Sequence, residues 1–233
     1  MGNSFKKAIV FIAVLSVILA GCDGSKSKDS AGVASGEAFS PILISEKDDF
    51  FSPDTIRDIE KYLEQGISIR ECLKKSGIVT FAEDGSILSI SQVSLSSAFV
   101  WGIELNDKKL GKDKLDTVLK ENDELGISIE PTDPKAKEVK YSVLKINGGT
   151  IQPSISHTYI LPYAENENVR DMLMGTDFVE LTVNKRMVHS VKGYVSKSVE
   201  KWVIKVNGKE LAEDGFDMKL SPRDEVEIKL DRA

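Results

Sequence analysis

The sequence has few cysteines and few histidines, and this scarcity excludes two common ways of stabilising a small fold. Only Cys22 and Cys72 occur among 233 residues, which is too few for a disulfide framework. His157 and His189 have no second His or Cys at metal-ligand spacing, which argues against a zinc site. We therefore expect the hydrophobic core to stabilise the fold.

Signatures of catalysis and of nucleic-acid binding are also missing. The net charge is −6, and no basic stripe follows the first seven residues, so a nucleic-acid partner is not expected. The chain has no Gly-x-Ser-x-Gly sequence, no phosphate loop and no dinucleotide fingerprint. It offers no convincing acid–base pair. We predict a protein that binds and is not an enzyme.

The N-terminus has the features of an export signal. Lys6 and Lys7 precede the apolar stretch Ala8–Ala20, which is shorter than the roughly 20 residues that span a bilayer. The sequence Leu19-Ala20-Gly21-Cys22 then resembles the lipobox of bacterial lipoproteins. The resemblance implies a signal peptide over residues 1–21, a diacylglyceryl group on Cys22, and anchoring on the extracytoplasmic face of a bacterial membrane. A plain secretory signal that contains a cysteine is the alternative.

A polar segment separates this signal from the folded protein. Residues 22–40 are rich in Ser, Gly, Asp, Lys and Ala and poor in large apolar side chains. Such a composition cannot bury enough surface to offset its ordering entropy. We interpret it as a flexible tether between the lipidated cysteine and the folded part.

The remainder contains an internal repeat, which appears when Trp101 is aligned with Trp202. Upstream, Arg70 faces Arg170 after a shift of one residue. We predict two modules, residues 41–130 and 135–233, joined near Pro131-Thr132-Asp133-Pro134. The identical pairs without a gap are Trp101/Trp202, Ile103/Ile204, Asn106/Asn207, Lys108/Lys209, Leu110/Leu211, Asp113/Asp214, Asp116/Asp217, Leu119/Leu220, Asp123/Asp224, Glu124/Glu225 and Ile127/Ile228.

Each module is predicted to be α+β: a small mixed sheet with one packed helix. In the second, Asn166 caps a helix over Glu167–Met174, and Asn207-Gly208 favours a type I′ turn. The first module has an extra helix that starts at Ser52-Pro53, a repeat helix over Ile69–Lys75, and Ile42-Leu43-Ile44 as a candidate strand. The strands expected in the second module are Val139–Asn147, Ser156–Tyr163, Phe178–Val183, Val188–Val195, Trp202–Val206 and Glu225–Leu230.

This pattern resembles the transcobalamin C-terminal-like domain, a family that also occurs in bacterial surface proteins. The resemblance implies a β-grasp-like fold, hence two tandem β-grasp-like modules, and cobalamin or a related corrinoid as a possible ligand. In eukaryotic transcobalamins a large α-helical barrel faces this domain, and this sequence has none. The second module's matching residues are Trp202, Asn207, Gly208, Lys209, Leu220, Asp224 and Val226. The first has Trp101, Asn106, Lys108, Leu119 and Asp123, with Asp107 where the family usually has Gly.

The repeated residues have both structural and functional interpretations. Trp101 and Trp202 are core anchors at the start of a strand, or stacking platforms for a ligand. Asn106 and Asn207 are expected to form turns, and Asp123 and Asp224 to accept backbone N–H groups. Cys72 aligns with Met172, which favours a buried inert thiol over a nucleophile.

We expect a non-enzymatic lipoprotein that binds a small ligand or an envelope partner, without any obligatory cofactor or metal. The partners expected are the membrane, through the lipid on Cys22, and a small molecule or protein of the envelope. A structural or adaptor protein whose exposed strand edges pair with a partner strand is the alternative.

Overall fold

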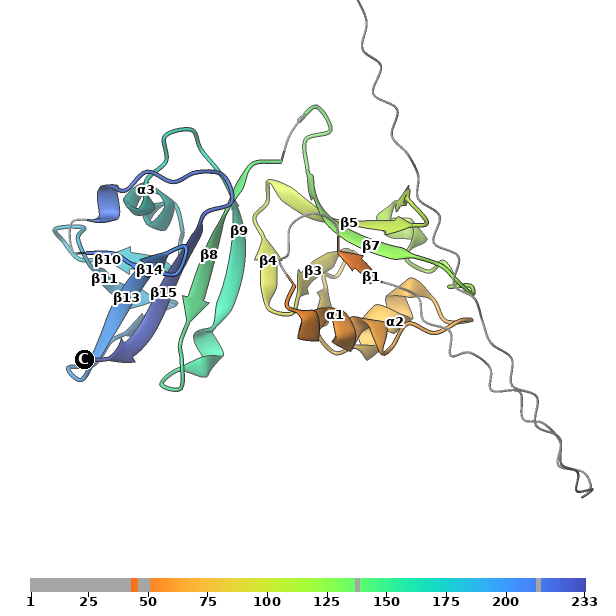
Figure 1. The fold of residues 1–233 in the computed structure, drawn as a ribbon, viewed down its shortest axis with the longest axis horizontal. Helices are drawn as coiled ribbons and strands as arrows, with labels where there is room; N and C mark the ends of the chain where they lie inside the picture. The colour runs from red at the N-terminus through yellow and green to blue at the C-terminus, as the bar shows by residue number, and fades with distance from the viewer. Residues whose placement is uncertain (1–42, 46–50, 137–138, 213–214) are drawn as a thin grey trace, which may run out of the picture. The chain divides into compact units, whose positions relative to one another are not determined.

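The computed structural model describes residues 43–45, 51–136, 139–212 and 215–233. The predicted signal peptide, Cys22 and the tether lie outside these residues. The described chain is a mixed α+β fold that consists mostly of sheet (Figure 1). Within the described ranges, no helix is long and apolar enough to cross a membrane.

The first half combines three short helical segments with a four-stranded sheet in the order β1-β7-β5-β6. A separate meander, β2-β3-β4, follows helix α2. The elements are β1 (Leu43–Ser45), α1 (Pro53–Glu60), α2 (Ile69–Lys75), β2 (Val79–Phe81), β3 (Ile87–Ile90), β4 (Val93–Leu95), β5 (Phe99–Leu105), β6 (Lys108–Leu110), the 3-10 turn Lys112–Lys114 and β7 (Leu125–Pro131).

The second half has the sheet order β14-β13-β15-β8-β9 and a three-stranded meander, β10-β11-β12. Strand β9 also pairs in parallel with β4, so the larger sheet continues into the β4-β3-β2 meander. The elements are β8 (Tyr141–Asn147), the 3-10 turn Pro153–Ile155, β9 (His157–Pro162), α3 (Val169–Met174), β10 (Val179–Leu181), β11 (Val188–Val191), β12 (Tyr194–Val195), β13 (Glu200–Val206), β14 (Lys209–Glu210), the 3-10 turn Gly215–Asp217 and β15 (Glu225–Arg232).

Each half has its own hydrophobic core beneath its helices. In the second half, Val169, Met172 and Leu173 of α3 are buried in the same cluster as Leu144 of β8 and Ile228 of β15, so the helix covers one face of that sheet (Figure 1). In the first half, α1 and α2 together contribute to the corresponding cluster. Burial of these apolar surfaces supplies the main stabilisation of each half.

The prediction for Cys72 is confirmed. Its side chain is 0% exposed on α2, carries no disulfide, and packs in the core of the first half. Burial raises the pKa of the thiol, because the low-dielectric core disfavours the thiolate. A thiol that stays protonated and inaccessible is a poor nucleophile.

The predicted roles of the repeated Asn and Asp residues are also confirmed. Asn106 has a φ of 52° in the turn after β5, and its side-chain amide donates to Asp123 at 2.7 Å. The second Asp123 oxygen accepts the Lys120 backbone N–H at 2.7 Å, and the Asn106 side-chain oxygen accepts the Glu124 N–H at 2.8 Å. These bonds tie the β5 turn to the start of β7. Asn207 and Asp224 repeat the arrangement between β13 and β15, with distances of 2.7 to 2.9 Å.

We expect Asp123→Ala to lower the free energy of unfolding by about 1 kcal/mol, because the Asn106 amide and the Lys120 N–H lose their acceptor. Asp123 is 8% exposed, whereas Asp224 is more accessible, so water can replace the lost bonds better in Asp224→Ala. Asp224→Ala should therefore lose less stability than Asp123→Ala, and urea denaturation of both variants measures the difference. Equal losses in the two variants would contradict the burial argument.

Two expected boundaries in the second half were wrong. Helix α3 begins at Val169, and its cap is Asn168, whose side chain accepts the Asp171 N–H at 2.8 Å. Asn166 instead has a φ of 64° in the preceding turn. The single strand expected over Val188–Val195 is two antiparallel strands, because Lys192 and Gly193 both take positive φ values and reverse the chain.

Glu167, two residues before α3, is an ionisable residue whose charged form is poorly solvated. Its Oε2 atom is buried, which raises the pKa of the carboxyl by more than the neighbouring Ala164 backbone and Ser142 hydroxyl lower it. Burial raises the pKa of this carboxyl above its ordinary value of 4.5, because the charged form is poorly solvated there. Its ionisation therefore opposes folding.

We expect Glu167→Gln to be more stable than the parent protein at pH 7 by about 1 kcal/mol. A raised folded-state pKa means that Glu167 contributes stability below its unfolded pKa, and that this contribution is lost as the pH rises through the folded pKa. The advantage of the variant should therefore disappear near pH 4, where both side chains are neutral. Urea unfolding at the two pH values measures this, and an advantage independent of pH would rule out the explanation.

Candidate functional site

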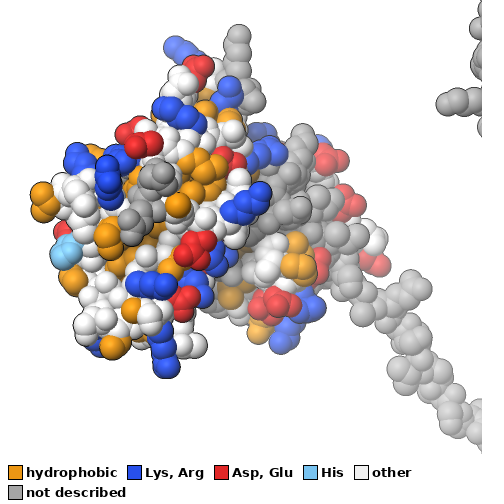
Figure 2. All heavy atoms as spheres, turned by 60° about the vertical axis from the view of Figure 1, so that its left-hand side comes forward, with side chains coloured by type: hydrophobic (Ala, Val, Ile, Leu, Met, Phe, Trp, Pro, Cys, Tyr) orange, Lys and Arg blue, Asp and Glu red, His pale blue; other side chains and the backbone are white. Residues whose placement is uncertain are grey.

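Exposed hydrophobic side chains are more numerous in the second half than in the first. Figure 2 shows hydrophobic side chains interspersed with charged ones on the face that it brings forward. Val183 and Met187 flank a shallow hollow of about 550 Å³ at the β10–β11 turn, and Met187 is 57% exposed. The exposed large hydrophobic residues of the second half are Met174, Val183, Met187, Val195, Val199 and Met218; those of the first half are Leu88, Val100 and Val118.

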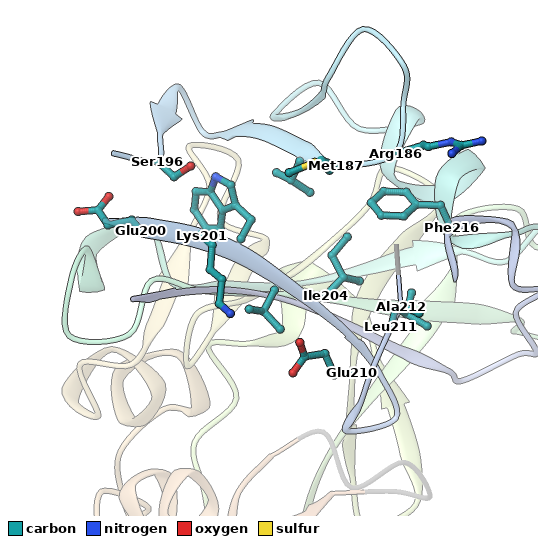
Figure 3. A pocket seen from close by; sticks show the side chains of 13 residues that line it. Arg186, Met187, Ser196, Glu200, Lys201, Ile204, Glu210, Leu211, Ala212 and Phe216 are labelled. Atoms are coloured by element: carbon teal, nitrogen blue, oxygen red, sulfur yellow. The ribbon is translucent and has the colours of Figure 1, made fainter. Parts of the chain in front are cut away.

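The candidate site is a second cavity, which lies along β13 and has a volume of about 320 Å³. Five consecutive residues of β13 line it, Glu200–Ile204. Met187 contributes to the opposite wall, and Leu211 and Phe216 close one end. In Figure 3, Met187, Ile204 and Phe216 border the same space, which they make apolar.

The consecutive lining residues Glu200–Ile204 show which faces of β13 the cavity reaches. Successive side chains of a strand point to opposite faces of the sheet. A cavity on one face alone would therefore be lined by every second residue. Because Glu200–Ile204 all contribute, the cavity reaches atoms on both faces of β13.

Trp202 is the large aromatic residue of this site. Tyr194 of β12 lies edge-on to its ring, with the two ring centroids 6.3 Å apart and the planes at 89°. The Trp202 Nε1 atom is buried and has no hydrogen-bond partner within the described structure, and the same holds for Trp101 Nε1.

Trp101 has a different environment. Its ring stacks on Phe51, with centroids 5.7 Å apart and an interplanar angle of 23°. Phe51 precedes the extra helix α1 and is buried in the core of the first half. The structure thus does not bring the two predicted tryptophans into one site: Trp101 packs on a core aromatic residue, and Trp202 borders a cavity.

A polar group bounds the other end of the cavity. The Tyr194 hydroxyl donates to Glu200 Oε2 at 2.8 Å, and the Lys197 backbone N–H donates to the same oxygen at 3.0 Å. The Lys197 N–H lowers the pKa of Glu200, and the tyrosine bond lowers it further, while the carboxylate raises the pKa of Tyr194. Glu200 is therefore ionised at neutral pH, and its other oxygen forms an ion pair with Lys197 Nζ at 4.0 Å.

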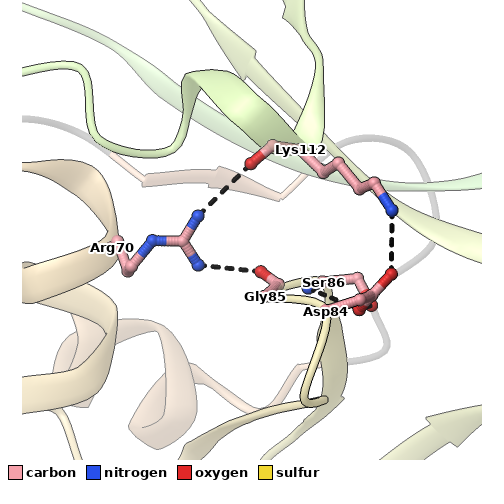
Figure 4. A network of polar contacts seen from close by, with 5 residues as sticks. All are labelled: Arg70, Asp84, Gly85, Ser86 and Lys112. Atoms are coloured by element: carbon pink, nitrogen blue, oxygen red, sulfur yellow. Dashed lines mark hydrogen bonds and ion pairs between the residues drawn. The ribbon is translucent and has the colours of Figure 1, made fainter.

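Arg170 holds the loop that carries Met187, and Arg70 holds the equivalent loop of the first half. Arg170 of α3 bonds to Asp217 at 3.0 Å and donates to the Lys185 carbonyl. In the first half, Arg70 donates to the Gly85 carbonyl at 2.8 Å and to the Lys112 carbonyl at 3.3 Å (Figure 4). The sequence repeat aligns Arg70 with Arg170. It did not predict that both side chains would hold a loop.

The described residues show no sign of a metal centre. No group of three or more His, Cys, Asp or Glu side chains in the described ranges is placed to hold an ion. His157 contacts Ser94 of β4 at 2.8 Å across the β4–β9 pairing, and burial lowers the pKa of its ring. This histidine serves the packing of the sheet.

Comparisons with known proteins place the chain in no family. No protein-family model matches it, and no curated protein is similar to it. A solved structure from Ruminococcus gnavus, of a protein for which metal binding has been suggested, is similar over 40% of this chain and 98% of its own, with 12% identity and a TM-score of 0.35. A similarity of that size carries no argument about this chain.

Proposed function

We propose that this protein is a lipid-anchored extracytoplasmic binding protein, and that its second half holds the ligand beside Trp202. The cavity along β13 is the observation that carries the proposal, because it combines an apolar wall with the Glu200 carboxylate at one end. Binding sites typically have such a lining, with a few polar groups that orient the ligand. The proposal assigns no catalytic residue.

We also propose that the two halves are copies of one β-grasp-like module. Equivalent strands pair in the same way: β7 pairs with β1 as β15 pairs with β8, both in parallel. The central antiparallel pairs β5–β7 and β13–β15 have equivalent registers around Trp101 and Trp202. The first half has α1 at the position in the chain where the second half has β9.

The size of the cavity narrows the choice of ligand. A volume of about 320 Å³ lies at the small end of the range for small-molecule sites. A corrin ring with all its substituents is larger than this, so a corrinoid could insert only a part of itself. The geometry favours a smaller group or a segment of a larger molecule.

The presence of only two tryptophans makes a direct test possible. In the full chain carrying Trp101→Phe, Trp202 is the sole tryptophan, and its emission reports the cavity. We expect a ligand from a panel of peptides, cobinamide and cobalamin to shift or quench this emission saturably, because it changes the polarity around the ring.

The matched control is Trp202→Phe, in which Trp101 alone reports from the core of the first half. Its emission should not respond to the same ligand. A panel without any saturable response in the Trp101→Phe variant would count against the binding proposal, and an equal response in both variants would count against the site.

An adaptor function is the second candidate, and the edge of β12 favours it. Strand β4 pairs with both β3 and β9, whereas β12 is the last described strand of its sheet. The nearby Val195 and Val199 are 50% and 66% exposed. A β-hairpin of another protein that pairs with β12, as β9 pairs with β4, would cover them.

A further inference from the structure

We infer that the β10–β11 loop, residues 182–187, docks onto the surface of a bilayer that contains anionic lipid. The inference rests on the proposed lipid anchor, which brings the protein to a membrane, and it names a second contact with that membrane. The loop combines exposed apolar side chains with basic ones, and surfaces of this composition bind at anionic membrane interfaces.

The side chains of the loop are exposed and of two kinds. Val183 is fully exposed and Met187 is 57% exposed, so two apolar side chains face solvent. Lys185 and Arg186, which lie between them in the chain, are exposed as well. Because residues 182–187 include no Asp or Glu, these two side chains give the loop a charge of +2, whereas the whole chain has −6. The loop is thus a basic and apolar site on an acidic protein.

The equivalent loop of the first half has the opposite character. Leu181 pairs with Val188 as Phe81 pairs with Ile87, so residues 82–86 connect their strands as residues 182–187 do. Their sequence is Ala-Glu-Asp-Gly-Ser, which has a charge of −2 and contains no large hydrophobic residue. The hairpin itself therefore does not require exposed valine, lysine or arginine, and these residues are available for a contact outside the fold.

The loop is held in shape before it meets a membrane. The Thr182 N–H donates to the Met187 carbonyl at 2.8 Å, and the Thr182 hydroxyl donates to the Asn184 side-chain oxygen at 2.7 Å. Arg170 donates to the Lys185 carbonyl at 2.6 Å. The bonds to Lys185 and Met187 use their backbone and not their side chains. A loop that is already ordered loses little conformational entropy on docking.

Two apolar and two basic side chains bind a membrane only weakly by themselves. In a protein that is already anchored, however, docking is an intramolecular step and benefits from the high local concentration that the anchor provides. Because Met187 also lines the Trp202 cavity, a docked loop places that cavity near the membrane surface.

The test places a reporter on the loop of the full chain, lipidated by an exporting host and reconstituted in vesicles. In Val183→Cys, the lipid blocks the Cys22 thiol and Cys72 is fully buried, so an environment-sensitive fluorophore labels residue 183 alone. In phosphatidylcholine vesicles that contain phosphatidylglycerol, its emission should rise and shift to the blue, because the label leaves water. Pure phosphatidylcholine should give no shift. Salt at about 1 M, where the Debye length is only about 3 Å, should reverse it.

The repeat supplies the control for the label, and exposed lysines supply the control for charge. Glu83→Cys puts the label on the loop of the first half, where it should not respond. In the labelled Val183→Cys protein, Lys185→Gln with Arg186→Gln should lower the ratio of docked to free loop about 25-fold, about fivefold for each basic residue. Lys120→Gln with Lys135→Gln changes the net charge equally at exposed sites outside the loop, and should leave the response unchanged.

The possible outcomes separate the inference from the proposed function. A shift at residue 183 that requires phosphatidylglycerol and the two basic side chains supports docking. Flotation of the protein with the vesicles but without this shift, or equal shifts at residues 183 and 83, overturns docking and leaves the lipid anchor. A shift that grows with the protein-to-lipid ratio and not with phosphatidylglycerol content identifies a second copy of the chain as the occupant, and overturns the lipid assignment. Absence of flotation overturns the anchor and the docking together.

Discussion

Replacing Cys22 with alanine is expected to abolish incorporation of labelled palmitate into the protein. The proposal of a lipid anchor assigns the diacylglyceryl group to the Cys22 thiol, and alanine has no nucleophile to accept it. Each buried methylene of an acyl chain contributes about 0.8 kcal/mol to membrane binding, so two chains hold a protein where one gives only marginal binding. Metabolic labelling followed by immunoprecipitation measures the effect.

Cys72→Ala is the matched control, because Cys72 is the only other cysteine and is fully buried on α2. This variant should keep the label in full. Label retained in Cys22→Ala, or lost in Cys72→Ala, would refute the assignment. Mass spectrometry of the N-terminal peptide would then show whether cleavage also occurs directly before residue 22.

The two tryptophans are expected to differ in their contribution to stability. Trp101→Ala should lower the free energy of unfolding by about 3 kcal/mol, because it removes the ring that stacks on Phe51 and leaves a void in the core. Trp202→Ala should lower it by about half as much, because the Trp202 ring already borders a cavity. The main effect of Trp202→Ala should be the loss of ligand binding.

Urea denaturation followed by circular dichroism checks this ranking, with Trp101→Phe and Trp202→Phe as conservative controls that keep an aromatic ring. A larger loss for Trp202→Ala than for Trp101→Ala would indicate that Trp202 is the core anchor of its half. The cavity would then be a consequence of packing, and the proposed site would lose its central residue.

Local structure was largely predictable where the signal lay within a few residues. Ser52 accepts the Thr55 N–H at 3.2 Å and Pro53 opens α1, as the Ser-Pro sequence predicted. Asn207 and Gly208 both have positive φ values, as the Asn-Gly turn requires. These features depend on short-range sterics and side chain to backbone bonds, which a sequence displays directly.

The prediction was wrong where the local sequence was compatible with two structures. Asn166 and Asn168 are both suitable helix caps, and tertiary contacts selected Asn168, because Val169 must point into the core for α3 to cover its sheet. Similarly, Lys192-Gly193 resembled an interior part of a strand. It is a turn because Val191 pairs with Tyr194, which places Tyr194 beside Trp202.

The sequence by itself determined the helix caps, the turns and the Asn–Asp pairs that recur in both halves, because each depends on residues that are close in the chain or repeated along it. It also aligned Trp101 with Trp202 as equivalent residues. Only the tertiary structure decided that they differ. Phe51 packs on Trp101, whereas a cavity adjoins Trp202. What surrounds a side chain depends on segments distant in sequence, and their packing is settled only when the whole core is assembled.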